Sequence, residues 1–390
     1  MMSPIAERLL SLVPAPGEEI RWEALAEIGL APLFSGMAAT MQNPFYHGEG
    51  DVLTHTGMVC EELLRDEGYR GADLFMRQAL FLAALLHDVG KIKCTRIEDG
   101  QLRSPYHASK GALTARRLLW REFGLCGTYE AQRLREVVCS LIRYHSAVPY
   151  MMHHENAEWR LLRIASCGEL ADGFTLKALC TLERADMRGR YGNDLAASLE
   201  KVAYCEMLAE ECGCLEAPYR FCDPYSQWGY MRKKTAWRGQ PLFRESWGEV
   251  ILLSGLPGTG KDTWIRKHHP DLPMVSLDEI RQRLHVLPTD KQAPVVAAAQ
   301  EEARALLRKK QPFIWNATSI TGDLRSKQID LFEQYGASVK TVFLETEWEE
   351  ELRRNAGRQA VVPVPVIESM LSRLEMPERF ECEEVQWEIT

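Results

Sequence analysis

The strongest constraint on this chain is a glycine-rich segment that joins an apolar run to a helix-like segment. Residues 251–263 read I-L-L-S-G-L-P-G-T-G-K-D-T, with Gly255 and Gly260-Lys261 at Walker A spacing. Glycines let a loop curl until its backbone N–H groups face phosphate oxygens, which a Cβ atom would obstruct. The positive end of the following helix and the Lys261 ammonium add charge of the right sign. We therefore expect a buried strand, a phosphate-binding loop and a helix.

This segment supplies most of the candidate nucleotide-binding residues. They are Gly255, Gly258, Thr259, Gly260, Lys261, Asp262 and Thr263, joined further along the chain by Arg358. Asp262 stands where a Ser or Thr usually offers its hydroxyl to Mg²⁺, and Thr263 follows it. The sequence leaves open whether Asp262, Thr263 or only water completes the Mg²⁺ shell.

Length and composition limit the architecture. A chain of 390 residues exceeds one ordinary core, so two or three domains are expected. The net charge of −8 argues against binding nucleic acid over the whole surface, so any such binding needs a local basic groove. No apolar stretch reaches membrane-spanning length, and the first residues lack a signal-peptide pattern. We therefore expect a cytoplasmic protein with no membrane partner, and its eleven scattered cysteines favour reduced thiols.

Two patterns divide the chain. Residues 1–217 show helical periodicity and almost no strand signal, which predicts an all-α domain. Residues 218–247 are rich in Pro, Gly, aromatic and basic residues and are interpreted as a connector, although such aromatics can also stack on single-stranded nucleic acid. Residues 248–390 alternate between strands and helices, which predicts an α/β domain with a parallel sheet. The expected strands are 249–254, 274–277, 312–315 and 338–344.

Histidines and carboxylates recur at separated positions of the helical region. They are His55, His87-Asp88, His107, His145 and Asp186. Each alone is explained as a structural residue near a helix end, but together they can converge on one cavity. Mixed nitrogen and oxygen ligands suit Mn²⁺, Fe²⁺, Co²⁺, Ni²⁺ or Zn²⁺ better than Ca²⁺. The Asp88 carboxylate can bridge two ions, and a pair of ions can activate water and clamp a phosphate.

This ordered set resembles the HD phosphohydrolase superfamily in its two-metal form. The flanking segments resemble the HD domains appended to tRNA nucleotidyltransferases. The resemblance implies two divalent transition metals (Mn, Co, Ni or Fe), with Asp88 bridging between them. By this resemblance, the first metal is held by His55, His87, Asp88 and Asp186, and the second by Asp88, His107 and His145. Lys91 matches the lysine that in many such enzymes contacts the scissile phosphate.

Other polar residues follow the expected strands of the second region. Asp278 ends the strand near 274–277, and Arg281 lies three residues on, hence on the same helical face. A carboxylate there can cap the helix, ligate Mg²⁺ or accept the proton of an attacking hydroxyl, which does not ionise by itself near neutral pH. Arg354 and Arg358, four residues apart, form either a solvated stripe or a lid that neutralises a transferring phosphoryl group.

These features resemble the P-loop 5′-hydroxyl polynucleotide kinases, which use Mg²⁺ with ATP or another NTP. The resemblance implies that Asp278 is the general base and that Arg281 grips a phosphate of the acceptor. It also implies that Lys261 contacts the nucleotide phosphates and that Arg354 and Arg358 belong to the lid. Asn316-Ala317-Thr318 stands where a D-A-T-like sequence is usual, so a common carboxylate is missing.

The order of the two regions resembles the bacterial HD-domain polynucleotide kinases, which heal broken RNA ends. The resemblance implies that the HD part hydrolyses 2′,3′-cyclic or terminal phosphates at 3′ ends. The kinase part would phosphorylate a 5′-hydroxyl of RNA or DNA, and a separate ligase would then use the healed ends.

Two alternatives stay open. The chain can instead join an HD nucleotide phosphohydrolase to a kinase for a nucleoside, sugar or other metabolite, or its P-loop region can be a nucleotide-sensing switch for the HD region. The pairing of Asp278 with Arg281 favours the polynucleotide kinase, because a phosphate-gripping group is useful only when the acceptor carries another phosphate.

Overall fold

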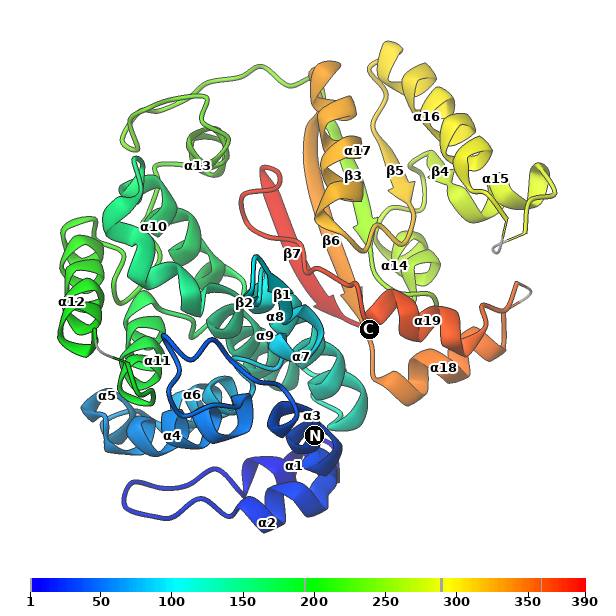
Figure 1. Ribbon diagram of the computed structural model, residues 1–390. Coiled ribbons are helices and arrows are strands. Elements are labelled where there is room, and N and C mark those ends of the chain that lie inside the picture. Colours follow the sequence, from blue (N-terminus) through cyan, green and yellow to red (C-terminus); the bar gives the residue numbers. More distant parts are fainter. Residues whose placement is uncertain (1, 193, 288–289, 359) are drawn as a thin grey trace. The chain divides into compact units, whose positions relative to one another are not determined.

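The computed structural model describes residues 2–192, 194–287, 290–358 and 360–390. The chain forms two compact units that divide between Tyr219 and Arg220 (Figure 1). Within these described ranges, no helix is both long and apolar enough to cross a membrane.

The first unit is helical. Its longer α-helices are α1 (Pro4–Leu10), α3 (Ala31–Ala38), α4 (Val52–Arg65), α6 (Leu74–Leu86), α8 (His107–Arg117), α9 (Tyr129–Tyr144), α10 (Ala157–Ala165), α11 (Leu176–Arg188) and α12 (Leu195–Glu211). Short helical turns complete it: α2 (Trp22–Leu25), η1 (Ala26–Leu30), α5 (Glu67–Arg70), α7 (Lys91–Cys94), η2 (Leu118–Glu122), η3 (His145–His153) and η4 (Ser166–Glu169). The all-α prediction for this region is confirmed.

Helix α6 is the centre of the helical unit. Its last eight residues, Ala79–Leu86, are all buried, and α4, α9 and α11 pack around it. A helix that is apolar on every side has to be enclosed in this way, because it has no face to offer to water. The chain becomes polar directly after this helix, at His87 and Asp88, which are also buried. This apolar helix therefore leads directly to two polar side chains in the interior of the unit.

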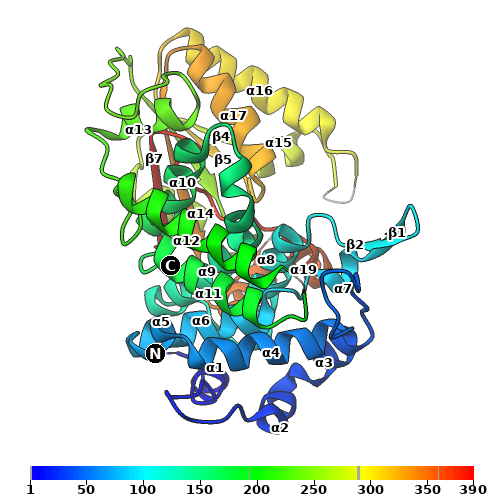
Figure 2. The same ribbon diagram turned by 60° about the vertical axis from the view of Figure 1, so that its left-hand side comes forward.

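One small sheet in this unit differs from the sequence expectation. Strands β1 (Arg96–Glu98) and β2 (Gln101–Arg103) pair as an antiparallel hairpin, which stands out from the helices in Figure 2. Asp99 and Gly100 form its turn with φ angles of 51° and 74°. Positive φ at both central residues matches the right-handed twist of a two-residue hairpin, and Asp-Gly is a preferred sequence for it. The Asp-Gly pair is the sequence signal for this hairpin.

The second unit is an α/β domain. Its helices are α13 (Pro224–Met231), α14 (Lys261–His268), α15 (Leu277–Arg283), α16 (Ala293–Arg308), α17 (Gly322–Gln334), α18 (Trp348–Ala356) and α19 (Val364–Leu371). Its strands are β3 (Glu249–Ser254), β4 (Met274–Ser276), β5 (Phe313–Asn316), β6 (Ser338–Glu345) and β7 (Glu384–Ile389). They form one sheet in the order β4-β5-β3-β6-β7, with every neighbouring pair parallel. The predicted α/β fold with a parallel sheet is confirmed.

Strand β3 lies in the middle of the sheet and sets the position of the phosphate loop. The chain adds β4 and β5 on one side of β3 and then crosses to add β6 and β7 on the other. Ligands of such sheets bind beyond the carboxyl ends of the strands where the winding reverses. Ile251 and Leu253 of β3 pack with Trp264 and Ile265 of α14 in a buried cluster. This packing fixes the loop between β3 and α14 at its two ends.

Two segments of the second unit differ from the sequence interpretation. The expected connector contains helix α13, which begins at the capping residue Asp223 and buries Trp228 completely. Arg232 after this helix pairs with Asp330 of α17, so the segment is part of the α/β unit. Strand β7 was not expected either. It pairs with β6 at the edge of the sheet, and its polar residues alternate with Val385, Trp387 and Ile389.

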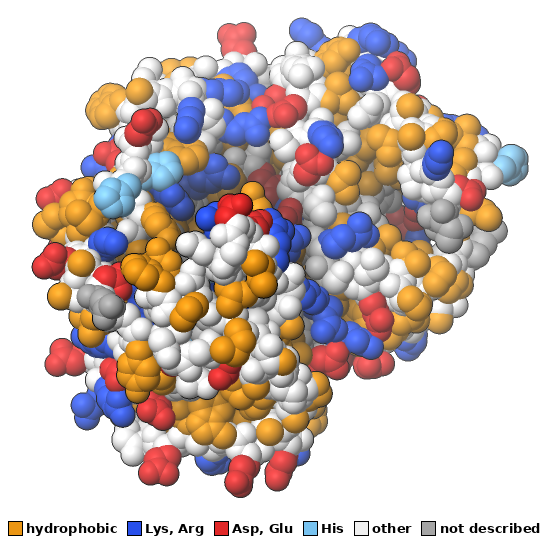
Figure 3. Space-filling view, in the orientation of Figure 1, with side chains coloured by type: hydrophobic (Ala, Val, Ile, Leu, Met, Phe, Trp, Pro, Cys, Tyr) orange, Lys and Arg blue, Asp and Glu red, His pale blue; other side chains and the backbone are white. Residues whose placement is uncertain are grey.

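The surface shown in Figure 3 carries Lys and Arg side chains interspersed with Asp and Glu side chains on both units. This mixture is consistent with the net charge of −8 and with the absence of a basic face in the view shown. A polyanionic ligand would have to be recognised by local groups in a site rather than by the surface as a whole.

Candidate active sites

The six histidines and carboxylates singled out in the helical unit are brought together in one group, here called the histidine cluster, in which all but the partly exposed His107 are buried. It consists of His55 on α4, His87 and Asp88 after α6, His107 at the start of α8, His145 after α9 and Asp186 on α11. Helix ends can present imidazole rings without interrupting the helical backbone, which explains why five separate segments meet here. Helices α4, α9 and α11 pack around α6, and α8 packs against α9.

Four of these side chains direct ligand-type atoms at one point. The Nε2 atom of His55 lies 3.3 Å from Nε2 of His87, 3.0 Å from Oδ1 of Asp186 and 3.6 Å from Oδ2 of Asp88. Nε2 of His87 lies 3.3 Å from the same Asp88 oxygen. Two nitrogens and two carboxylate oxygens therefore surround a space suited to a cation.

The other oxygen of Asp88 faces a second pair of histidines. Oδ1 lies 3.6 Å from Nε2 of His107 and 4.0 Å from Nε2 of His145, and these two nitrogens are 3.3 Å apart. Oδ1 is buried and receives no hydrogen bond from the described residues. A buried carboxylate oxygen without a donor is unfavourable unless a cation completes it. Asp88 thus offers one oxygen to each of two groups of donors, which fits a bridge between two metals.

The second ring nitrogens show which imidazole atoms are available to a metal. Nδ1 of His87 lies 2.8 Å from the Ala84 carbonyl oxygen, and Nδ1 of His145 lies 2.7 Å from that of Ile142. A carbonyl oxygen can only accept a hydrogen bond, so Nδ1 carries the proton and Nε2 presents its lone pair. Burial also lowers the pKa of His145 to about 3, which keeps this ring neutral.

Glu49 is a candidate functional residue that sequence reasoning missed. Its Oε1 atom lies 3.0 Å from Nδ1 of His55, and its Oε2 atom accepts a hydrogen bond of 2.9 Å from the backbone N–H of Tyr191. A carboxylate behind a metal-binding imidazole fixes the ring and raises its basicity. His47, 2.8 Å from Glu49, is the other neighbour of this carboxylate. The spacing of His47, Glu49 and His55 was visible in the sequence, but only the fold shows that Glu49 reaches the ring.

Lys91 lies beside Asp88, with Nζ 2.6 Å from Oδ2. The same ammonium donates a hydrogen bond of 2.6 Å to Oε1 of Gln42, a buried side chain that the sequence did not single out. Burial by itself would raise the pKa of Asp88, but the neighbouring Lys91 and His87 outweigh it and hold the pKa well below the usual range. Asp88 is therefore a carboxylate, the form that a metal requires.

The glycine-rich loop of the second unit connects β3 to α14. Gly255 and Gly258 have φ angles of 143° and 94°. A Cβ atom on Gly255 would lie 2.6 Å from the Leu344 carbonyl oxygen, and one on Gly258 would lie 2.6 Å from that of Glu351. Both positions therefore require glycine, for backbone conformation and for space. Thr259 is buried in this loop and its hydroxyl donates to the Leu256 carbonyl at 2.9 Å.

Lys261 turns back onto the loop. Its Nζ atom donates hydrogen bonds of 2.9 and 2.8 Å to the carbonyl oxygens of Gly255 and Leu256. Burial lowers the pKa of Lys261 to about 8, and the carboxylates of Asp278 and Asp262 act against that shift. The ammonium is therefore held where a phosphate of a nucleotide would meet it, by carbonyl groups that a phosphate can replace.

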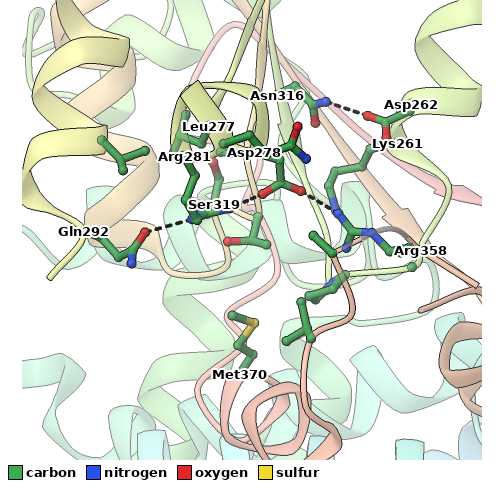
Figure 4. Close-up of a pocket in the computed structure, with 18 of the residues that line it drawn as sticks. Lys261, Asp262, Leu277, Asp278, Arg281, Gln292, Asn316, Ser319, Arg358 and Met370 are labelled. Atoms are coloured by element: carbon green, nitrogen blue, oxygen red, sulfur yellow. Dashed lines mark hydrogen bonds and ion pairs between the residues drawn. The ribbon is translucent and has the colours of Figure 1, made fainter. Parts of the chain in front are cut away.

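Asp278 is paired with two arginines (Figure 4). Arg281 donates from Nη1 to Oδ1, and Nη2 of Arg358 lies 2.5 Å from Oδ2. Arg281 is also held by Gln292, whose Oε1 accepts from Nε at 3.0 Å. Burial would raise the pKa of Asp278, but Arg281 and Arg358 outweigh it and lower the pKa. Asp278 is therefore ionised, as a proton acceptor must be.

One cavity of about 1030 Å³ connects these groups, and it is called the loop cavity below. Its lining includes Gly258, Gly260, Lys261, Asp262, Thr263, Asp278, Arg281, Arg354 and Arg358. Gly255 and Thr259 belong to the loop but do not line the cavity. Arg354 contacts Glu350 through Nε at 2.7 Å and Thr390 through Nη1 at 3.2 Å. Most of the predicted nucleotide-binding and catalytic residues of this unit therefore border one space.

Comparison with known proteins agrees with this division. Residues 52–177 match the model of the HD domain family, and residues 250–377 match that of an AAA domain family. The chain thus carries an HD domain followed by a kinase-like P-loop domain. The HD match spans His55 to His145 and ends before Asp186, and the AAA match spans the whole lining of the loop cavity.

Two solved structures that are similar to the chain each match only part of it. A protein of Chloroflexus aurantiacus provisionally described as a kinase is 17% identical, with 37% of this chain and 85% of that chain covered and a TM-score of 0.31. A gluconokinase of Sinorhizobium meliloti 1021 is 20% identical, with the same two coverages and a TM-score of 0.29. No curated protein sequence matches the chain significantly.

Proposed function

We propose that the chain is a bifunctional enzyme that heals nucleic-acid ends. The kinase-like unit would transfer the γ-phosphate of ATP or another NTP to a 5′-hydroxyl, and the HD unit would hydrolyse 2′,3′-cyclic or terminal phosphates at 3′ ends. The proposal is carried by one observation: the carboxylate of Asp278 and the guanidinium of Arg281 border the same cavity as the phosphate loop. A base and a second phosphate-binding group beside one phosphate loop suit an acceptor that has both a hydroxyl and a phosphate.

In the proposed transfer, the oxygen of the 5′-hydroxyl attacks the γ-phosphorus, and the bond from that phosphorus to the β-phosphate oxygen breaks. The proton of the hydroxyl passes to Asp278, and the nucleoside diphosphate leaves. Lys261 neutralises charge on the β- and γ-phosphates, while Arg354 and Arg358 stabilise the transferring group. Mg²⁺ would neutralise further phosphate charge, and the Asp262 carboxylate in the cavity lining is the type of oxygen ligand that Mg²⁺ takes.

Asp278 can act as a base only when its oxygens are accessible. In the chain alone, Arg358 occupies Oδ2. A bound triphosphate carries more negative charge than one carboxylate and would attract this guanidinium away. Arg281 would remain on Asp278 because Gln292 holds it from the other side. The two arginines thereby take different roles, Arg358 toward the nucleotide and Arg281 toward a phosphate of the acceptor.

In the proposed hydrolysis, a water oxygen attacks the phosphorus of the cyclic phosphate, the bond from that phosphorus to one of the two ribose oxygens breaks, and the leaving oxygen takes up the proton that the water loses. Two transition metals held by the histidine cluster would supply an activated water and neutralise the phosphate. Asp88 offers one oxygen to each half of the cluster, and Lys91 places a positive charge 2.6 Å from it. In the proposed reaction this ammonium would contact an oxygen of the scissile phosphate.

The alternative function joins the HD unit to a kinase of a nucleoside, sugar or other metabolite. The test is to offer labelled ATP and Mg²⁺ with 5′-hydroxyl RNA, 5′-hydroxyl DNA, nucleosides and gluconate. Gluconate is included because a gluconokinase is among the similar structures. Transfer to an oligonucleotide at rates well above those for nucleosides and gluconate supports the proposal. Transfer only to a small molecule would overturn it.

The HD reaction is tested separately with an oligonucleotide that ends in a 2′,3′-cyclic phosphate. Mn²⁺, Co²⁺, Ni²⁺ and Fe²⁺ are compared with Mg²⁺, because imidazole-rich ligation favours the transition metals. A protein that heals both ends would act in the cytoplasm together with a separate ligase, which joins the 5′-phosphate to the freed 3′ end. Failure to open or remove the phosphate with any of these ions would contradict this half of the proposal.

A further inference from the structure

Two departures from the usual P-loop pattern meet in the loop cavity. P-loop enzymes commonly hold Mg²⁺ with the hydroxyl of a Ser or Thr after the loop lysine and with an Asp at the end of a strand. This chain has Asp262 after Lys261 and Asn316 at the end of β5. A carboxylate therefore stands at the usual hydroxyl position, and a neutral amide stands at a strand end. The pair still carries one negative charge in total.

The structure places these two side chains in direct contact. Nδ2 of Asn316 donates a hydrogen bond of 2.8 Å to Oδ1 of Asp262, as Figure 4 shows. Asn316 is buried, and its strand β5 lies between β3 and β4, opposite Ser276. The amide therefore has a fixed position from which it can orient the more exposed carboxylate. One oxygen of Asp262 is used by this bond, and the other accepts no hydrogen bond from the described residues.

Thr263 offers a competing hydroxyl, but its surroundings differ. Its Oγ1 atom accepts a hydrogen bond of 3.1 Å from Nη2 of Arg266, and the side chain is exposed. An oxygen that already faces a guanidinium is a poor place for a divalent cation because the two positive charges repel each other. Asp262 instead faces Asn316 and contributes negative charge to the environment of Lys261.

We propose that Asp262 is the protein's ligand for the Mg²⁺ of the bound nucleotide and that Asn316 is its positioning residue. In the common arrangement a neutral hydroxyl follows the loop lysine and a carboxylate ends the strand. Here the carboxylate of Asp262 follows the lysine and the neutral amide of Asn316 ends the strand, so the two departures compensate each other. The inference rests on the proposed nucleotide site of the kinase-like unit, but it is independent of the acceptor. It explains how the site keeps one carboxylate although the strand end has lost its own.

The test measures nucleotide binding without any acceptor. The affinity of the full chain for ADP is titrated with and without Mg²⁺, and the Mn²⁺–ADP complex is followed by electron paramagnetic resonance. Asp262→Asn keeps an oxygen that can accept from Asn316 but removes the charge. We expect it to lose about 10-fold or more of the metal-dependent affinity while metal-free ADP binding stays near the wild-type value. Asp271→Asn, which removes a charge from an exposed loop outside the cavity lining, is the matched control.

A reciprocal exchange makes the test specific. Asp262→Ser leaves no carboxylate in the pair and should weaken Mg²⁺-dependent binding, whereas Asp262→Ser combined with Asn316→Asp rebuilds the common arrangement and should recover it. A double variant that binds no better than Asp262→Ser would overturn the exchange. Unchanged metal dependence in Asp262→Asn, or its loss in Thr263→Ala alone, would overturn the assignment of the ligand.

The outcomes also separate this inference from the proposed function. Each variant is checked for an unchanged melting profile and for unchanged phosphoesterase activity, which the HD unit supplies. Intact Mg²⁺-dependent ADP binding without transfer to any 5′-hydroxyl end would contradict the proposed function and leave the role of Asp262 standing. Transfer to a 5′-hydroxyl end with normal Mg²⁺ dependence in Asp262→Asn would contradict only the role of Asp262.

Discussion

In the histidine cluster, imidazole nitrogens and carboxylate oxygens lie close together, and one buried carboxylate oxygen has no hydrogen-bond donor among the described residues. In the loop cavity, Lys261 is hydrogen-bonded to carbonyl oxygens and Asp278 is paired with arginines. Nε2 atoms of His55 and His87 lie 3.3 Å apart, and Oδ1 of Asp88 has no hydrogen-bond donor among the described residues. Asp278, by contrast, is bound by Arg281 and Arg358. In the first site a carboxylate oxygen is left for a cation, whereas in the second the charged side chains bordering the cavity are bound to one another.

This difference predicts how each site responds to its ligands. A buried carboxylate oxygen without a hydrogen-bond donor is costly, and a cation relieves that cost without moving the ligands. The loop cavity has to exchange partners, because Lys261 is bonded to loop carbonyls and Arg358 to Asp278. We therefore expect metal binding to change the helical unit little, and nucleotide binding to move side chains in the α/β unit.

The largest expected effect comes from removing the bridge of the histidine cluster. Asp88→Ala should reduce phosphoesterase activity to background and lower the number of bound transition metals, because one side chain serves both halves of the cluster. Further removal of His107 should add little, since ligands that act as a unit are not additive. Metal content by mass spectrometry and cyclic-phosphate hydrolysis measure this, with Asp172→Ala as a control at an exposed carboxylate. Kinase activity should remain, and its loss in a folded protein would show that the sites are not separate.

The second expected effect concerns the base of the loop cavity. Asp278→Ala should lower transfer to a 5′-hydroxyl by about 10² to 10⁴, the usual contribution of a general base. Phosphoesterase activity should not change, because all residues of the histidine cluster belong to the other unit. Single-turnover transfer measured at saturating ATP isolates the chemical step. Normal transfer in this variant would remove Asp278 from the mechanism.

Much of this comparison could be predicted from the sequence, because it depends on local patterns. The Walker A spacing and the apolar helix that leads into His87-Asp88 each occupy a short segment, and the alternation after residue 248 is a series of short strands and helices. The four expected strands agree with the structure to within one residue at each end. Strand β7 was not predicted because Glu384–Ile389 is an edge strand, where polar residues alternate with apolar ones and the hydrophobic signal for a strand is weak. Helix α13 was not predicted either, although Asp223 followed by Pro224 is a typical beginning of a helix.

The contacts between distant segments could not be predicted in this way. Gln42 meets Lys91 and Glu49 meets His55 only because the helical unit folds those segments together. The bond between Asn316 and Asp262 likewise depends on the pairing of β3 with β5. Sequence patterns predicted which residues could bind a metal or a phosphate, but not which neighbours orient them.

A smaller effect tests one of these orienting contacts. Glu49→Gln keeps the size of the side chain and an oxygen that can accept from His55, but it removes the negative charge behind the ring. We expect metal affinity of the HD unit to fall by about 10- to 100-fold, as is typical when such a supporting partner is changed. Glu49→Asp should retain part of the affinity because the charge remains. Competition with a metal-sensitive dye measures this, and equal affinity in Glu49→Gln and wild type would show that the carboxylate does not support the metal.

The last prediction concerns stability rather than activity, and its subject is Glu351 of α18, the counterpart in the α/β unit of the buried, unpaired Asp88 oxygen. Glu351 is fully buried, and neither of its carboxylate oxygens is hydrogen-bonded within the described part of the chain. Burial raises its pKa to about 8, although the nearby Lys261 opposes the shift. Asp88 keeps its charge because Lys91 and His87 surround it, whereas Glu351 takes up a proton. Glu351 should therefore bind no metal, and its charge should lower stability at high pH.

The sign of this pH effect follows from the two pKa values. Below the unfolded value of about 4.5, Glu351 is protonated in both states and has no effect on the pH dependence. Between about 4.5 and 8 the folded state retains a proton that the unfolded state releases, so stability falls as the pH rises, and the loss is complete above 8. Glu351→Gln does not titrate and should melt higher than wild type at pH 8.5, with a smaller difference at pH 5.5. Each pKa unit corresponds to about 1.4 kcal/mol, and each kcal/mol to about 2 to 4 °C in a unit of this size.

The measurement uses the melting transition that ATP shifts to higher temperature, since ligand binding marks the kinase-like unit. Glu349→Gln, at an exposed position of the same helix, is the matched control and should show no such pH-dependent gain. If Glu351→Gln raised the melting temperature equally at both pH values, its effect would come from packing rather than from ionisation. If it lowered the melting temperature at pH 8.5, the carboxylate would be stabilising and the pairing with Lys261 would outweigh burial. The contrast with Asp88 would then be lost, because both units would keep a buried carboxylate charged by means of a lysine.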